Sequence, residues 1–178
     1  MTVIPLTRDH ALRQGVGALS EMGVDGATRD ARLLLADVLG IDAGELIATG
    51  YDIVRNEAAD LYAAALTRRI RGEPVSRIRG WREFYGRQFA ITPDVLDPRA
   101  DTETLVEAGL ARLPDGGRVL DLGTGSGCVL ISILAERQAA RGVGVDLSED
   151  ALGVARNNAQ EHGVADRAEW VCGSWDSA

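Results

Sequence analysis

The stretch RVLDLGTGSG, residues 118–127, decides the fold of this chain. A short apolar run, Val119–Leu122, leads directly into three alternating glycines, and a helical segment is expected from Val129 to Arg137. Glycines let the main chain turn tightly and approach a ligand closely, and the free N–H groups at the start of a helix face that ligand. We therefore predict a strand, a ligand-binding turn and a helix in this order.

The alternation of apolar runs and helical segments continues after this turn. A second strand is expected over Gly142–Val145, a second helix over Glu149–His162 and a third strand over Glu169–Cys172. Such alternation is typical of a parallel, doubly wound sheet with right-handed crossovers. The predicted fold class is α/β, with a Rossmann-like sheet.

An acidic residue at the end of the second predicted strand indicates the kind of ligand. Asp146 follows Gly127 by 19 residues, and a carboxylate at this place can accept hydrogen bonds from both hydroxyl groups of a ribose. The dinucleotide fingerprint requires a third glycine where this chain has Cys128, so NAD is the less favoured nucleotide. After the third strand, Trp175 is predicted to flank the base.

Composition excludes several other classes of protein. The formal net charge of −8 repels phosphate backbones and argues against a general nucleic-acid binder. No apolar run approaches the ~18 residues that a membrane span needs, and no secretory signal is visible, so we expect a cytoplasmic chain. Cys128 and Cys172 are expected to be buried, reduced thiols, and no Cys or His spacing indicates a metal site.

The first part of the chain predicts a small helical bundle. Apolar residues keep helical spacing before Gly23, before Gly40 and from Leu61 to Leu66, and Asn56 is the expected cap of this last segment. A further short helix is expected to start at Asp42. Nothing in this part indicates catalytic chemistry, so we interpret it as a packing or docking module.

A change of period marks the linker that follows. Period-two apolar positions around Gly80 and Gly86 predict short strands or a hairpin rather than a helix. A helix is expected to start near Asp101, with Leu105, Val106 and Leu110 on one face. The expected divisions are a helical domain at 1–73, a linker hairpin at 74–97 and a partial Rossmann-like domain at 98–178.

Seven arginines gather between Arg68 and Arg87 and leave two interpretations open. They could form a basic patch that contacts an acidic or RNA-associated partner. However, every basic residue other than histidine in this chain is arginine and none is lysine, which indicates a general bias of composition.

With these residues in view, the whole chain resembles the glutamine methyltransferases of peptide chain release factors, the HemK or PrmC family. The resemblance covers the helical part, the linker around Trp81–Gly86, the stretch Val95–Glu107 and then DLGTGSG. Its most specific element is Pro-Arg-x-Asp-Thr-Glu at 98–103, which methyltransferases in general lack. The chain departs from the family at Asp97, which is more often apolar, and at Ala100, which is more often proline.

This resemblance implies the cofactor and the substrate. The cofactor is S-adenosylmethionine, and the substrate is the side-chain amide of the glutamine in the Gly-Gly-Gln loop of a release factor, gripped by the helical domain. Arg99 and Thr102 are assigned to the substrate side. A monomer without membrane, metal or nucleic-acid partner is expected. The implied cofactor-binding residues are Asp121, Gly123, Thr124, Gly125, Ser126, Gly127, Asp146, Leu147 and Trp175.

The family's Asn-Pro-Pro-Tyr motif, which holds the reacting amide, does not occur among the 178 residues. We therefore name no catalytic residue, and we expect a truncated chain that transfers no methyl group by itself. Two alternatives remain open at this point. The chain could be a non-catalytic cofactor-binding or docking module, or a methyltransferase that acts on nucleic acid.

Overall fold

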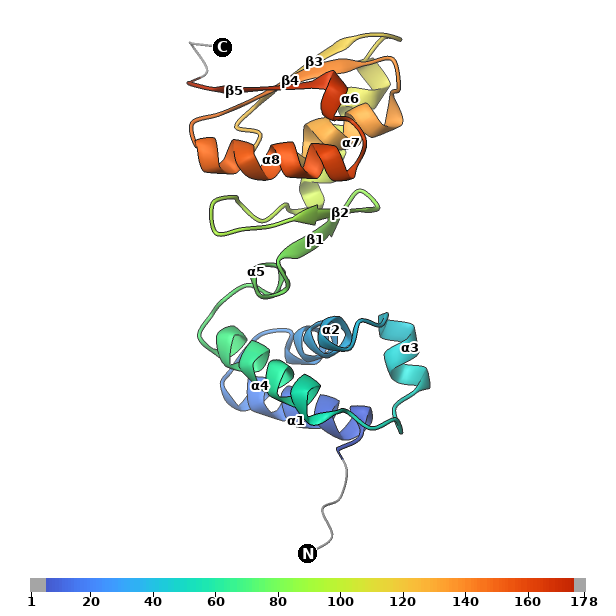
Figure 1. Ribbon diagram of the computed structural model, residues 1–178, viewed down its shortest axis with the longest axis vertical. Coiled ribbons are helices and arrows are strands. Elements are labelled where there is room, and N and C mark those ends of the chain that lie inside the picture. The colour runs from blue at the N-terminus through green and yellow to red at the C-terminus, as the bar shows by residue number, and fades with distance from the viewer. Residues whose placement is uncertain (1–5, 175–178) are drawn as a thin grey trace, which may run out of the picture. The chain divides into compact units, whose positions relative to one another are not determined.

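The computed structural model describes residues 6–174. The chain divides into two compact units, with the boundary between Arg79 and Gly80. Unit 1 consists of helices, and unit 2 contains the hairpin and the parallel sheet (Figure 1). Within residues 6–174, no helix is long and apolar enough to cross a membrane.

Unit 1 is the predicted helical bundle. Its helices are α1 (Arg8–Glu21), α2 (Ala27–Leu39), α3 (Ala43–Ala48), α4 (Asn56–Ile70) and α5 (Val75–Arg79). The predicted helix start at Asp42 is confirmed, because its side chain accepts a hydrogen bond from the Glu45 amide. The prediction that Asn56 caps α4 is wrong. Arg55 holds the extended cap position, and Asn56 is already the first helical residue.

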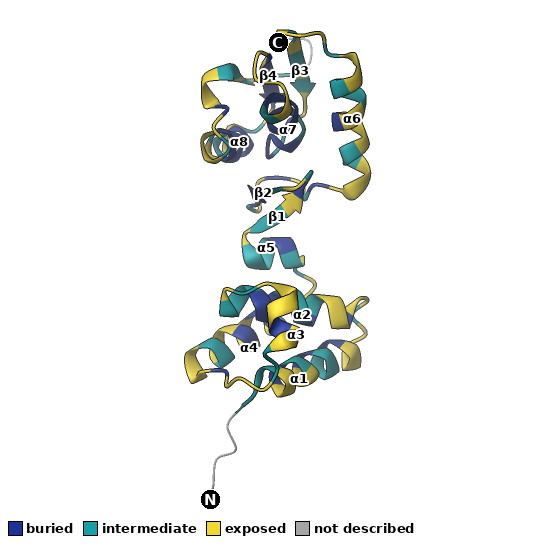
Figure 2. Ribbon diagram, turned by 90° about the vertical axis from the view of Figure 1, so that its right-hand side faces the viewer, coloured by how far each residue is buried: buried dark blue, intermediate teal, exposed yellow. Residues whose placement is uncertain are grey.

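The core of unit 1 lies where α2 meets α1 and α4. Leu19, Leu34 and Leu35 are fully buried, and Figure 2 shows buried positions of α2 in dark blue. The Tyr62 hydroxyl donates a hydrogen bond of 3.1 Å to the carbonyl oxygen of Ala31, so that α4 is joined to α2 by a polar contact as well as by packing. Burial of this phenol raises its pKa far above the ordinary value, which keeps the hydroxyl a donor.

The linker region differs in part from its prediction. Val75–Arg79 forms the short helix α5 instead of a strand, because Pro74 fixes the entry and its carbonyl oxygen accepts from the amides of Arg77 and Ile78. The hairpin itself is confirmed. β1 (Trp81–Phe84) pairs antiparallel with β2 (Arg87–Ala90) through a two-residue turn at Tyr85-Gly86, where both residues have positive φ.

The predicted α/β fold of unit 2 is confirmed. β3 (Arg118–Leu122), β4 (Arg141–Asp146) and β5 (Ala168–Cys172) form a parallel sheet in the order β3-β4-β5. Its crossovers contain α7 (Cys128–Glu136) and α8 (Glu149–Glu161), and α8 is followed by a 3-10 turn at Ala165–Arg167. A second 3-10 turn, Ala100–Thr102, leads into α6 (Glu103–Arg112).

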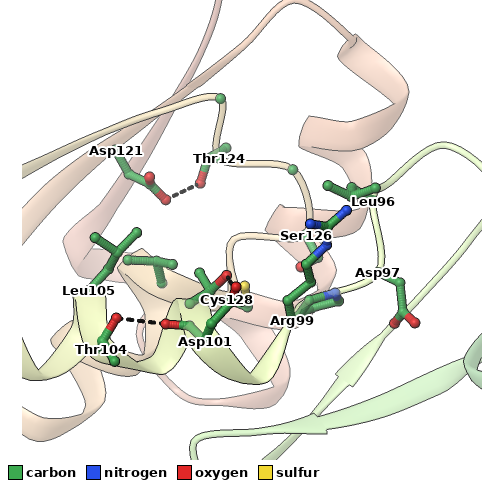
Figure 3. A pocket seen from close by; sticks show the side chains of 15 residues that line it. Leu96, Asp97, Arg99, Asp101, Thr104, Leu105, Asp121, Thr124, Ser126 and Cys128 are labelled. Carbon is green, nitrogen blue, oxygen red and sulfur yellow. Dashed lines mark hydrogen bonds between the residues drawn. The ribbon is translucent and has the colours of Figure 1, made fainter.

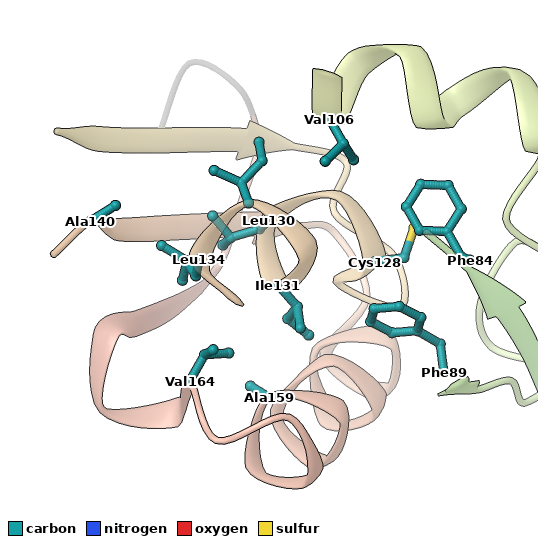
Figure 4. Close-up of a cluster of buried hydrophobic side chains, with 11 residues drawn as sticks. Phe84, Phe89, Val106, Cys128, Leu130, Ile131, Leu134, Ala140, Ala159 and Val164 are labelled. Carbon is teal, nitrogen blue, oxygen red and sulfur yellow. The ribbon is translucent and has the colours of Figure 1, made fainter. Parts of the chain in front are cut away.

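The hairpin is part of the core of unit 2. Phe84 and Phe89 belong to the same buried cluster as Leu130, Ile131 and Leu134 of α7, all of them 3% exposed or less (Figure 4). The two phenyl rings meet edge to face with their centroids 6.1 Å apart. The hairpin therefore holds a fixed place beside the helices that cover the sheet.

β3 is one of the two edge strands of the described sheet, and two of its leucines are exposed. Leu120 is 58% exposed and Leu122 is 41% exposed. On α6, the apolar residues predicted to lie on one face differ in burial, because Val106 is fully buried whereas Leu105 is 59% exposed. Leu105 instead lines a pocket described below.

The arginines between Arg68 and Arg87 are largely engaged in ion pairs within their own units. Such pairing neutralises much of the positive charge that a basic patch would present to a partner. It therefore favours the interpretation that these arginines reflect the general use of arginine in place of lysine in this chain. The pairs are Arg68–Glu73, Arg69–Asp30, Arg79–Asp37, Arg82–Asp97 and Arg87–Glu136.

Candidate functional site

The glycine-containing loop at 123–127 folds over the carboxyl end of the neighbouring strand. The amides of Gly123 and Thr124 both donate to the carbonyl oxygen of Val145 in β4, at 2.8 and 3.0 Å. The amide of Gly127 donates to the carbonyl oxygen of Thr124, and α7 begins at the next residue. The loop is thus a closed turn between β3 and α7, as the sequence predicts.

Asp146 fixes this loop from the end of β4. One carboxylate oxygen accepts from the Gly125 amide at 2.9 Å, and the other accepts from the Ser148 amide at 3.0 Å. Each oxygen retains a lone pair, so the carboxylate can still accept from a hydroxyl group. Leu147, the next residue, is 75% exposed beside it.

Two glycines of the loop have different surroundings. Gly127 has φ +78°, and a Cβ added there would lie 2.8 Å from Ile131 and 3.0 Å from Trp170, so that only glycine fits. Gly125 has φ +54°, but a Cβ added there would meet no atom within 4 Å. Gly127 allows the loop to pack closely against its neighbours, and Gly125 leaves space in front of the loop.

A pocket of about 640 Å³ opens at this loop (Figure 3). One wall is the loop with Asp121, and the opposite wall is the chain from Leu96 to Leu105. The structure therefore brings together seven of the predicted residues: Asp121, Gly123, Thr124, Gly125, Ser126, Arg99 and Thr102. Gly127, Asp146 and Leu147 do not line the pocket, although Asp146 is bonded to Gly125, which does. Trp175 lies outside the described residues.

Asp121 is the acidic group at the base of the loop. Burial raises the pKa of its carboxyl group, and the nearby charge of Asp146 adds to the rise, whereas the hydrogen bond from Thr124 opposes it. That bond joins Thr124 Oγ1 to Asp121 Oδ2 at 2.7 Å. Within residues 6–174 this partly desolvated carboxylate forms no ion pair, so it is suited to meet a positively charged group of a ligand.

Arg99 supplies positive charge at the opposite wall. Its side chain is exposed, extends toward Ser126 in Figure 3 and has no ion-pair partner within residues 6–174. The neighbouring Asp97 is paired instead with Arg82, at 2.6 Å. Besides Arg99 and Thr102, this wall includes Leu96, Thr104 and Leu105, which the sequence analysis did not assign to the site. Their nearness to the 98–103 stretch was the signal that could have indicated them.

The two cysteines differ from each other. Cys128 lines the pocket but is only 7% exposed, and burial raises the pKa of its thiol to about 11, so it is protonated near neutral pH. The prediction that Cys172 is buried is wrong. Cys172 ends β5 at the carboxyl edge of the sheet, and it is exposed there. Among residues 6–174, no three side chains of His, Cys, Asp or Glu gather as metal ligands would.

Two sequence families match the chain, one in each unit. Residues 10–80 match the family described as PrmC N-terminal domain, and residues 113–176 match a family described as methyltransferase domain. The second match spans β3, the loop, β4 and β5, and thus the elements that form one wall of the pocket.

Curated relatives match both units in one alignment. A protein named release factor glutamine methyltransferase from Rhodospirillum rubrum is 47% identical over 97% of this chain and 54% of its own length. A protein of the same name from Cereibacter sphaeroides is 48% identical over 94% of this chain and 60% of its own length. The chain therefore spans between about half and three fifths of these relatives, and the resemblance found in the sequence is confirmed over both units.

Solved structures match part of the chain. An RNA methyltransferase from Salinibacter ruber in complex with S-adenosyl-L-homocysteine is 34% identical over 47% of this chain and 53% of its own, with a TM-score of 0.41. A SAM-dependent methyltransferase from Geobacter sulfurreducens with the same ligand is 37% identical over 43% of this chain and 29% of its own, with a TM-score of 0.37. Because both TM-scores lie below 0.5, the fold is assigned from its own strand order and register.

Proposed function

We propose that this chain, which is related over nearly its whole length to release factor glutamine methyltransferases, binds S-adenosylmethionine in the pocket at the 123–127 loop. The observation that carries the proposal is the loop itself. Its Gly125 amide is held by Asp146, and its open side faces Arg99 and Thr102 across the pocket. The match of residues 113–176 to a methyltransferase domain supports the same cofactor.

The residues present fit such a ligand. The methionine part of S-adenosylmethionine carries an ammonium and a sulfonium cation, and the Asp121 carboxylate lies at the pocket to meet positive charge. Gly125 leaves the space that a ligand needs against the main chain. Asp146 is proposed to accept from the ribose hydroxyls, with Leu147 and Trp175 beside the base.

The names of the relatives indicate the acceptor. We propose that these residues belong to an enzyme that methylates the side-chain amide of a release factor glutamine in a Gly-Gly-Gln loop. In this proposal unit 1 binds the release factor, and Arg99 and Thr102 lie on the acceptor side of the pocket. S-adenosylmethionine supplies the methyl group, and its transfer to the amide nitrogen leaves S-adenosylhomocysteine and releases one proton. We place this reaction in the cytoplasm, where translation ends.

An amide nitrogen is a weak nucleophile, because its lone pair is delocalised into the carbonyl group. Catalysis must therefore come from fixing the amide in line with the methyl group and from oriented dipoles. The 178 residues contain no Asn-Pro-Pro-Tyr motif to hold that amide. We propose that the chain by itself binds the cofactor without transferring the methyl group.

Calorimetric titration tests the cofactor. The 178-residue chain is expected to bind S-adenosylhomocysteine and S-adenosylmethionine but not NAD, and Asp146→Ala is expected to weaken binding at least about tenfold, or ~1.4 kcal/mol. Glu149→Ala serves as a control, because Glu149 is an exposed acid on the first turn of α8 that bonds only Arg156 among the described residues. Equal affinity for NAD, or no binding of either adenosyl compound, would refute the proposal.

The acceptor is tested separately by retention on immobilised chain. Purified release factor is expected to be retained, and duplex DNA of equal concentration is not. The same preparation incubated with labelled S-adenosylmethionine should transfer no methyl group to the release factor. Retention of DNA without release factor would favour a nucleic-acid substrate, and measurable methylation would contradict the inactivity of the 178-residue chain.

A further inference from the structure

Asn158 is a buried polar residue of α8 that the proposed function does not yet use. It is 2% exposed and makes hydrogen bonds to two segments that are distant in sequence. Its Oδ1 accepts from the Ala90 amide at 2.8 Å, and its Nδ2 donates to the Ala90 carbonyl oxygen at 3.3 Å. The same Nδ2 donates to the Ser126 carbonyl oxygen at 2.9 Å.

The bonds to Ala90 hold the free edge of the hairpin. β2 pairs with β1 on one side only, and on the other side α8 satisfies its main chain. His162 donates from Nε2 to the Gln88 carbonyl oxygen at 2.7 Å, four residues after Asn158, and its ring lies 4.8 Å from that of Phe89. Asn158 of α8 and His162, the residue that follows α8, therefore bond the edge of β2 that β1 does not cover.

The bond to Ser126 has a different consequence. Ser126 lines the pocket and is 2% exposed, and its carbonyl oxygen accepts the hydrogen bond from Asn158 Nδ2. From β4, Asp146 bonds the amide of Gly125, and the carbonyl oxygen of Val145 bonds the amides of Gly123 and Thr124. Asn158 adds a hydrogen bond to the loop from α8, and the same side chain also bonds Ala90 of the hairpin.

The hairpin leads directly to the second wall of the pocket. Ile91 and Val95, which follow β2, are buried against Ala151 and Val154 of the same α8. Leu96, the next residue, begins the wall that contains Arg99 and Thr102. One helix thus contacts both the loop and the segment that leads to the second wall, and Asn158 bonds Ser126 of the loop and Ala90 of the hairpin.

We propose that Asn158 is a positioning residue for the cofactor site, which fixes Ser126 of the loop relative to the wall that follows the hairpin. This inference rests on the proposed function, because it assigns Asn158 an effect on adenosyl-ligand affinity. Only an amide supplies two donors and an acceptor in this place. A carboxylate lacks the donors, and an aliphatic side chain of similar size lacks all three groups.

Two variants and a matched neighbour test the proposal by calorimetric titration with S-adenosylhomocysteine below the unfolding transition. Asn158→Asp and Asn158→Leu are expected to bind at least about tenfold more weakly than the parent chain. Asn157→Asp makes the same chemical change at the exposed adjacent residue and should bind within about twofold of the parent. Circular dichroism shows that each protein titrated is folded.

A stability control separates positioning from mere support of the fold. Val164 follows α8, is 1% exposed and belongs to the core of unit 2, so Val164→Ala removes buried volume there. Val164 is neither in the 123–127 loop nor among the residues that line the pocket. The variant should lower the melting temperature and leave the affinity unchanged. If Asn158→Leu behaves in the same way as Val164→Ala, Asn158 has only a structural role and the inference is wrong.

Amide exchange in the unmodified chain gives a result even if both Asn158 variants fail to fold. Binding of S-adenosylhomocysteine should slow exchange of the Ala90 amide, which lies on the hairpin, while the α2 amides of unit 1 remain unchanged. Ligand binding without added protection at Ala90 would overturn the inference and leave the proposed function intact. Absence of binding by the parent chain would overturn both.

Discussion

Replacement of Gly127 by alanine is expected to lower the stability of unit 2 by about 2–5 kcal/mol. The left-handed conformation at φ +78° costs alanine about 1–2 kcal/mol. The added Cβ would also lie 2.8 Å from Ile131, 3.0 Å from Trp170 and 3.2 Å from Ala155, and crowding of this kind costs about 1–3 kcal/mol. For a unit of this size each kcal/mol lowers the melting temperature by about 4–8 °C, so a fall of at least about 8 °C is expected.

Gly125→Ala should separate ligand binding from stability. The conformational cost at φ +54° is again about 1–2 kcal/mol, but the new methyl group meets no atom within 4 Å. Gly125 lines the pocket, so the methyl group would occupy space proposed for the ligand. The affinity for S-adenosylhomocysteine should therefore fall by at least about tenfold, or ~1.4 kcal/mol.

Differential scanning calorimetry and titration measure the two effects on the same samples. Gly153→Ala in α8 is the control, because its Cβ meets nothing within 4 Å and its φ is not positive. It should leave affinity unchanged and raise stability by up to about 1 kcal/mol. If Gly125→Ala kept the parent affinity, or Gly127→Ala melted no lower than Gly125→Ala, the account of the loop would be refuted.

Three further outcomes are expected. The pKa of Asp121 is raised in the folded chain, so the contribution of this carboxyl group to stability is largest at acid pH and is lost as pH rises through the folded pKa. Asp121→Asn should abolish this loss of stability, as measured by urea unfolding at several pH values. The same variant should also weaken S-adenosylmethionine binding. A thiol reagent near neutral pH should modify the exposed Cys172 and leave Cys128 unmodified until denaturant is added, and equal rates would contradict the burial of Cys128. Leu134→Ala, at a fully buried site, should lower the unfolding free energy by about 2–5 kcal/mol, whereas a change below that range would mean that the core collapses around the cavity.

Local patterns predicted most of unit 2. β3, β4 and β5 begin and end within two residues of their expected bounds, because each is a short apolar run bounded by turn residues or helix caps. The loop was recognisable because its glycines and Asp146 keep a spacing that the chemistry of the site requires. Both signals come from residues that lie within a few tens of positions of one another in the sequence.

Contacts between distant segments were not predictable in this way. The partner of Asn158 in the hairpin is 68 residues away, and an asparagine in a polar stretch of helix gives no sign of burial. The arginines between Arg68 and Arg87 similarly find acids up to 49 residues away, which only the folded chain brings near. At α5, the helix-starting effect of Pro74 outweighed an alternating pattern.

The exclusive use of arginine has a consequence for alkaline conditions. Lysine ammonium groups begin to lose charge near pH ~10.4, whereas guanidinium groups remain protonated above pH ~12. The partly buried ion pairs of the helical unit, Arg69–Asp30 and Arg79–Asp37, both use guanidinium groups. Tyr62 resists ionisation over the same range, because its surroundings disfavour the phenolate. The helical unit is thus built from contacts that moderately basic buffers leave intact.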